Sequence, residues 1–150
     1  MIKNFKDGDH MRLMGLDVGD RRIGVAVSDP LGLFAQGIST IVRQDGTNKD
    51  IEEIKKIINQ YQVEKIVIGL PKNMNNTIGP MGEKVMQYAK TVEKKTGKPV
   101  VLFDERLTTA AAERMLIQAD VSRKKRKGVI DKIAAVYILQ SYMENQKNSV

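Results

Sequence analysis

Three acidic residues stand where secondary-structure elements are expected to begin or end, and together they could act on a phosphodiester bond. Asp17 closes a short apolar run, Glu105 follows another, and Asp131 lies at the expected start of the last helix. Carboxylate oxygens are hard ligands that suit Mg²⁺ or Mn²⁺. Such an ion lowers the pKa of its bound water and neutralises charge on the leaving oxygen, so in-line hydrolysis needs no histidine.

The composition narrows the other chemistry that this chain of 150 residues could perform. It has no cysteine, which excludes disulfides, thiolate zinc sites and cysteine nucleophiles. Its single histidine, His10, lies in a polar stretch before the first apolar run, which makes a histidine base a poor candidate. The net charge of +7 predicts attraction to polyanions such as nucleic acid or an acidic membrane.

The length predicts one domain over residues 11–150, with residues 1–10 as a disordered extension that is either native or left from expression. No apolar run approaches the roughly 20 residues that a membrane helix needs. The N-terminal stretch also lacks the apolar centre of a signal peptide. We therefore expect a cytoplasmic protein with no membrane partner.

The apolar patterning predicts a mixed α/β domain, because short apolar runs alternate with segments of helical spacing. The expected strands cover residues 12–17, 23–28, 37–42, 65–69 and 99–103, and the expected helices cover 48–62, a segment ending near Gly97, 109–119 and 129–143. The strands at 65–69 and 99–103 are expected to be buried. This order predicts an antiparallel meander extended by parallel strands with crossover helices.

Such a fold would bring the three carboxylates to one rim. Ligands in open α/β sheets collect beyond the carboxyl ends of the strands, which predicts that Asp17 and Glu105 lie together. Alanines share the helical face of Asp131, and small side chains would let this helix approach the sheet. Three gathered carboxylates would repel one another without a cation. The ordinary alternatives are a turn at Asp17, an ion pair of Glu105 with Arg106 or its neighbours, and a helix-start charge at Asp131.

Four ordered motifs resemble those of the YqgF/RuvX family. They are GLDVG with RIGVAVSD between residues 15 and 29, IGLP at 68–71, DERLTT at 104–109 and DKIAA at 131–135. The resemblance covers about residues 11–143 and implies a ribonuclease H-like fold, related to Holliday-junction resolvases, with a mixed five-stranded sheet flanked by helices. It also implies a nuclease that matures the 5′ end of pre-16S rRNA, with Asp17, Glu105 and Asp131 as its catalytic, metal-binding residues. Members often have glycine where this chain has Asn76, and asparagine tolerates the left-handed conformation.

Basic and polar residues near the expected rim are candidates for contacts with a nucleic-acid backbone. They are Arg21 and Arg22 in the first hairpin turn, Lys72 and Asn73 in the loop after residue 69, and the run Arg123, Lys124, Lys125, Arg126 and Lys127. Taken singly, each could equally be a solvated surface residue. Aromatic residues make up only 5% of the chain, so extensive stacking on aromatic platforms is not expected.

Several classes of function stay open on the sequence. A metal-dependent endonuclease acting on pre-16S rRNA, within ribosome biogenesis and with ribosomal precursor particles as partners, is preferred on the resemblance alone. A Holliday-junction resolvase acting on branched DNA is the first alternative, and a homodimer would suit such a symmetric substrate. A phosphotransferase of the actin and sugar-kinase kind shares the first hairpin motif but normally needs two such domains. A non-catalytic nucleic-acid-binding module is the remaining alternative.

Overall fold

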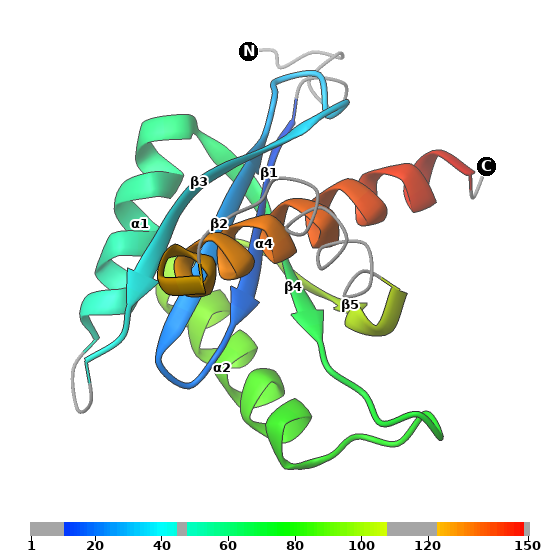
Figure 1. The fold of residues 1–150 in the computed structure, drawn as a ribbon. Coiled ribbons are helices and arrows are strands. Elements are labelled where there is room, and N and C mark those ends of the chain that lie inside the picture. The colour runs from blue at the N-terminus through cyan, green and yellow to red at the C-terminus, as the bar shows by residue number, and fades with distance from the viewer. Residues whose placement is uncertain (1–10, 45–47, 108–122, 149–150) are drawn as a thin grey trace.

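The computed structural model describes residues 11–44, 48–107 and 123–148 (Figure 1). In chain order the elements are β1 (Arg12–Val18), β2 (Arg22–Ser28), β3 (Ala35–Val42), α1 (Lys49–Tyr61), β4 (Val63–Leu70), α2 (Pro80–Thr96), β5 (Val100–Asp104), the short 3-10 helix η2 (Glu105–Leu107) and α4 (Arg123–Asn148). Five strands and three of the helices lie where the sequence predicts them. The helix expected over 109–119 lies outside the described residues.

The five strands form one mixed sheet in the order β3-β2-β1-β4-β5. β1 pairs with β2 in antiparallel fashion, with Asp17 opposite Gly24, and β2 pairs likewise with β3. β4 lies parallel to β1, and β5 lies parallel to β4. The antiparallel meander extended by parallel strands is therefore confirmed. The carboxyl ends of β1, β4 and β5 point the same way, which gives the sheet a common rim.

Helices cover both faces of the sheet (Figure 1). α1 and α2 pack on one face, where Met14 and Leu16 of β1 join their core. α4 crosses the other face, where Leu13 of β1 and Ile138 share a second core. Because successive side chains of a strand point to opposite faces, Asp17 faces α4 while its neighbours Leu16 and Val18 face α1 and α2.

α4 approaches the sheet closely because glycines on β1 and β2 carry no side chain beneath it. A Cβ on Gly24 would collide with the carbonyl oxygen of Asp131. A Cβ on Gly15 would lie 2.7 Å from the Cβ of Leu139. The sequence indicated the small residues of the helix, and Ala135 is fully buried. The matching glycines on the strands were not predicted to have this role.

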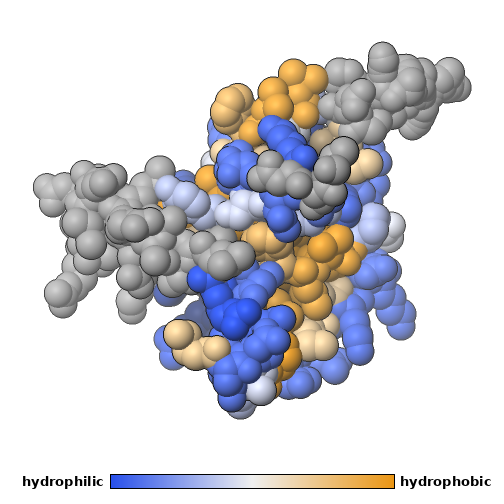
Figure 2. Space-filling model, turned by 90° about the vertical axis from the view of Figure 1, so that its right-hand side faces the viewer, coloured by the Kyte–Doolittle hydropathy of each residue, from blue (hydrophilic) through white to orange (hydrophobic). Residues whose placement is uncertain are grey.

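Two sequence expectations are wrong in detail. α4 begins at Arg123, so Asp131 lies in its third turn and does not open it. Lysine and arginine are good helix formers, and Gly128 is tolerated inside the helix, so the basic run extends α4. β5 is not a buried strand, because it forms the edge of the sheet and Leu102 is 37% exposed. Figure 2, which views the molecule from this side, shows hydrophobic surface among hydrophilic residues.

Local sequence explains where the other helices end. α1 ends at Gln62 and α2 at Gly97, and both residues adopt the left-handed conformation, with φ of 57° and 74°. Gly97 is the predicted glycine cap, and its N–H donates to the carbonyl of Glu93 at 3.0 Å. Among the residues that the structure describes, no helix is both long and apolar enough to cross a bilayer.

Candidate active site

The structure brings the carboxyl groups of Glu105 and Asp131 into the surroundings of Asp17. Asp17 lies near the end of β1, Glu105 opens η2 directly after β5, and Asp131 lies on α4 above Gly24. Burial raises the pKa of Asp17 to about 8, and the charge and a side-chain hydrogen bond of Glu105, followed by the charge of Asp131, act in the same direction. Glu105 and Asp131 therefore lie near enough to Asp17 to raise its pKa, and their role as a catalytic metal site stays a prediction.

Gly69 lies beside Glu105 and beneath Ile138 of α4. It follows Ile68, which pairs with Leu16 next to Asp17. A Cβ on Gly69 would lie 3.4 Å from Cδ of Glu105 and 2.5 Å from Cδ1 of Ile138. Gly69 belongs to the IGLP motif, so the sequence marks it as a residue of interest. The apolar pattern of the strand does not indicate its contact with Glu105 and Ile138.

Arg22 forms an ion pair with Asp131 that the sequence did not indicate. Its Nε donates a hydrogen bond to Oδ2 of Asp131 at 2.8 Å, and the two side chains are 33% and 20% exposed. Arg22 was expected to contact phosphate, and the structure gives its Nε a protein partner. The ordinary interpretation of Asp131, a charge at a helix start, is excluded because α4 starts two turns earlier.

The three carboxylates form a loose cluster. Within the described part of the chain, no group of three or more acidic or histidine side chains is arranged to hold a metal ion directly. Coulombic coupling reaches further than coordination, which requires oxygen atoms about 2.0–2.6 Å from the ion. Asp17 and Glu105 can therefore influence each other electrostatically without a finished three-residue metal site. Mg²⁺ usually keeps several waters and needs only one or two carboxylates, which this hydrogen-bonded pair supplies.

The chemistry of this pair fits a divalent cation. The charge and a side-chain hydrogen bond of Glu105 favour the protonated form of Asp17. Two neighbouring carboxylates repel each other when both are ionised. A divalent cation can take the place of the proton on Asp17 and relieve this repulsion. Hard oxygen ligands favour Mg²⁺ or Mn²⁺ over softer metals. The donor set therefore suits such an ion.

The loop between β4 and α2 is built by its own asparagines. The N–H of Asn73 donates to the carbonyl of Thr77 at 2.8 Å, and its side-chain amide donates to Oγ1 of Thr77 at 2.9 Å. Asn76 adopts a φ of 70°, which confirms that asparagine supports the left-handed conformation there. Lys72 reaches Oδ1 of Asn76 only at 3.4 Å. Asn73 thus has a structural role, and a nucleic-acid contact of either residue stays a prediction.

Arg106 binds Asp104 and joins the loop to the end of β5. Its Nη2 lies 2.6 Å from Oδ2 of Asp104 and 3.3 Å from Oδ1 of Asn76. Its hydrogen bonds lower the pKa of Asp104 below the ordinary value. Arg106 therefore pairs with Asp104, the residue that precedes Glu105. This pair fixes the strand end from which Glu105 emerges.

The remaining basic candidates are Arg21 and the run at 123–127. Arg21 is exposed in the turn between β1 and β2. Residues 123–127 form the first turns of α4, but their side chains lie outside the described residues. Their contact with nucleic acid remains a prediction.

The sheet order and the helices on its two faces define a ribonuclease H-like fold. The solved structure of Thermus thermophilus RuvC in complex with a Holliday junction substrate is similar, with a TM-score of 0.57 and 12% identity over 93% of this chain and 98% of that chain. A second structure of RuvC from the same organism has a TM-score of 0.50 and 11% identity over 92% and 97% of the two chains. At these identities the likeness concerns the fold alone.

The family follows from the sequence comparisons. The RuvX family, described as Holliday junction resolvase, matches residues 11–145. A relative from Listeria innocua is 61% identical over 136 residues, covering 89% of this chain and 98% of the relative. One from Clostridioides difficile is 62% identical over 138 residues, covering 92% and 97%. Both carry the name "Putative pre-16S rRNA nuclease". The chain belongs to the RuvX family, which confirms the resemblance of its motifs.

Proposed function

We propose that the protein is a metal-dependent endonuclease that hydrolyses phosphodiester bonds in the 5′-end processing of pre-16S rRNA. The observation that carries this proposal is the coupling of the largely buried Asp17 to Glu105 and Asp131 at one rim of the sheet. The names of relatives about 60% identical support the RNA substrate. Precursor ribosomal particles in the cytoplasm are the corresponding partner and location.

Asp17 and Glu105 would hold the metal ion, with Asp131 as the third acidic group beside it. Mg²⁺ or Mn²⁺ bound there supplies an acidified water and neutralises charge on the leaving oxygen. Asp17 would hold the ion as an ionised carboxylate, which a neighbouring cation stabilises. Arg22 holds Asp131 at 2.8 Å and so fixes the third carboxylate relative to β2. Gly69 keeps the space for Glu105 open.

The basic surface would provide affinity for the nucleic-acid backbone. The exposed Arg21 lies in the turn that follows β1, close in sequence to Asp17. Lys72 and the run from Arg123 to Lys127 would add further contacts to phosphates. Such contacts release counterions, so binding should weaken steeply with salt and carry little sequence information.

A second candidate function is the resolution of branched DNA. The description of the family as Holliday junction resolvase favours it. A four-way junction is two-fold symmetric, so this activity would call for a homodimer. The carboxylate chemistry would be the same for both substrates, because both reactions cleave phosphodiester bonds.

Cleavage assays with two substrates test the proposal. The purified chain is incubated with Mg²⁺ or Mn²⁺ and either an RNA spanning the 5′ end of 16S rRNA with its leader, or a synthetic four-way DNA junction. We expect cleavage of the RNA by the parent protein and none by Asp17→Asn. Cleavage of the junction alone would favour the resolvase. Binding without cleavage in either metal would instead identify a non-catalytic binding module.

A further inference from the structure

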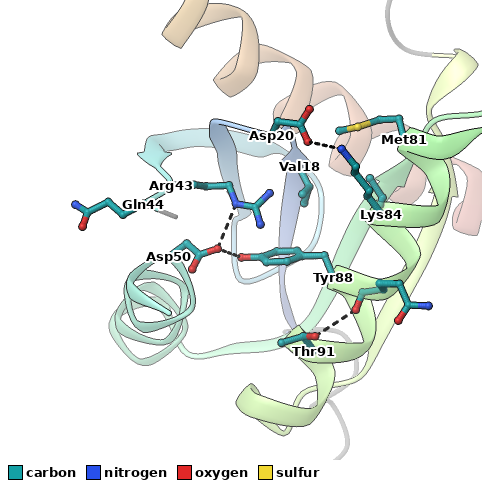
Figure 3. Close-up of a pocket in the computed structure, with 11 residues that line it drawn as sticks. Val18, Asp20, Arg43, Gln44, Asp50, Met81, Lys84, Tyr88 and Thr91 are labelled. Atoms are coloured by element: carbon teal, nitrogen blue, oxygen red, sulfur yellow. Dashed lines mark hydrogen bonds and ion pairs between the residues drawn. The ribbon is translucent and has the colours of Figure 1, made fainter. Parts of the chain in front are cut away.

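A cavity lies on the face of the sheet opposite the carboxylates and is shown in Figure 3. It has a volume of about 540 Å³ and is bordered by the end of β1, the segment after β3, α1 and α2. Val18 lines this cavity, whereas the preceding residue, Asp17, faces α4. One strand therefore separates the two sites, and the turn after Val18 connects them.

A fixed guanidinium group is the central feature of this cavity. Nη1 of Arg43 donates to the carbonyl of Gly19 at 2.7 Å, and its Nε lies 3.5 Å from Oδ2 of Asp50. The guanidinium lies over the ring of Tyr88 at 4.7 Å, and the hydroxyl of Tyr88 donates to Asp50 at 2.6 Å (Figure 3). The side chain of Arg43 is still 28% exposed. A planar cation held in this way can stack on a second planar group at little cost in side-chain entropy.

The charges around the cavity are balanced. Arg43 faces Asp50, which is only 6% exposed, and Lys84 faces Asp20 at 3.5 Å (Figure 3). A balanced set of charges offers little net attraction to a free anion, since each cation already has a carboxylate beside it. The best ligand is therefore a planar group without a charge of its own.

The rest of the lining combines apolar and hydrogen-bonding groups. Val18, Met81 and Val85 supply apolar surface, and Gln87 and Thr91 supply polar groups. Cavities that combine an apolar surface with a few polar groups bind and orient small ligands. A nucleobase matches this lining, because it has two apolar faces and an edge of donors and acceptors.

We propose that this cavity binds the base of an unpaired nucleotide next to the scissile phosphodiester. The base stacks on the guanidinium of Arg43, and its edge meets Gln87. This inference rests on the proposed function, since it requires a nucleic-acid strand at the carboxylate site. The nucleic-acid strand would pass from the carboxylate site at Asp17 around the exposed turn at Arg21 and reach the cavity. Single-stranded segments allow a base to turn out of its stack, so the cavity would select substrates with an unpaired flank.

Binding of base-containing and abasic RNA tests this proposal. The probe is an RNA hairpin with a single-stranded adenosine tail, compared with the same hairpin carrying an abasic tail, in EDTA so that no cleavage occurs. One stacked base should make the adenosine tail bind about tenfold more tightly to the parent protein. In Arg43→Lys and Gln87→Glu this advantage should fall below about threefold. Gln60→Glu, the same change at an exposed position of α1, should keep it.

The outcomes separate the cavity from the cleavage activity. An equal advantage of the adenosine tail in the parent and both cavity variants would overturn the proposal, as would its absence in the parent. Equal weakening of both tails would indicate a phosphate contact and would also overturn it. If Arg43→Lys does not fold, the Gln87→Glu variant decides whether the cavity binds the base. The side chain of Gln87 is exposed, so this change should leave the fold intact. Failure to cleave any substrate would refute the proposed nuclease activity. It would not change the comparison between the adenosine tail and the abasic tail.

Discussion

Arg22 and Asp131 are 109 positions apart in the chain, yet Nε of Arg22 lies 2.8 Å from Oδ2 of Asp131. The pair joins β2 to the third turn of α4, directly above Gly24, where the helix touches the strand. Asp131 therefore has a neighbouring cation even before a metal ion binds. This arrangement makes Arg22 a positioning residue for the third carboxylate of the cluster.

Replacement of Arg22 by glutamine should lower cleavage more than binding. Asp131 would lose the group that orients it, and we expect kcat to fall about tenfold or more with little change in KM. The ion pair is partly exposed, so the free energy of unfolding should change by no more than about 1 kcal/mol. The matched control is Arg21→Gln, which should raise KM and leave kcat nearly unchanged. A raised KM with unchanged kcat in Arg22→Gln, together with a lowered kcat in Arg21→Gln, would refute the positioning role of Arg22.

The stability of the metal-free protein should depend on Asp17 and pH. Because the folded-state pKa of Asp17 is raised from 3.8 to about 8, its stabilising contribution is complete below pH 3.8 and is lost as the pH rises through 8. Near pH 8 the ionisation of the buried Asp17 carboxyl group costs free energy in the folded state. Asparagine cannot ionise, so the Asp17→Asn variant should unfold several degrees higher than the parent at about pH 8 in EDTA. Thermal unfolding at several pH values measures the difference. A variant less stable than the parent at this pH would contradict the buried, coupled carboxyl group.

A divalent ion should stabilise the parent protein through the same site. Mg²⁺ or Mn²⁺ at about 100 times its Kd would add about 2.7 kcal/mol to the free energy of unfolding. Because the ion competes with the proton on Asp17, whose pKa is raised to about 8, the shift at a fixed ion concentration should grow as the pH rises through 8. Asp17→Asn and Glu105→Gln should each lose most of the shift in melting temperature. An unchanged shift in both variants would place the ion elsewhere.

Gly69→Ala should impair the site through the added methyl group. The new Cβ would press on Ile138 and approach Cδ of Glu105, so both stability and cleavage should fall, with an overpacking cost of about 1–3 kcal/mol. Adding Ile138→Val removes the Cδ1 atom and should restore most of the stability. Cleavage should remain reduced, because the added Cβ, 3.4 Å from Cδ of Glu105, restricts the movement of that side chain toward a metal ion. Full recovery of cleavage in the double variant would show that Gly69 serves only packing.

The sequence predicts the elements of this fold better than the contacts between them. The alternation that places Met14 and Leu16 on one face of β1 is local, as is the glycine cap at Gly97. Asp17 was therefore found from its position at a strand end. The contact of Arg22 with Asp131 spans 109 positions, and no local pattern encodes it.

The elements that were misplaced share a physical reason. The start of α4 was placed too late because the basic run lacks apolar residues at helical spacing, although its residues favour a helix. β5 looked buried because its residues are apolar, while its burial depends on its position at the sheet edge. The cavity at Arg43 depends on four separate segments, so it could not be seen in the sequence.

Anomalous diffraction from Mn²⁺-soaked crystals of the full chain tests the central claim most directly. We expect an anomalous peak bound by carboxylate oxygens of Asp17 and Glu105, with Asp131 beside it, and no such peak in Asp17→Asn. A Mn²⁺ peak bound only elsewhere on the parent protein would contradict the proposed metal site.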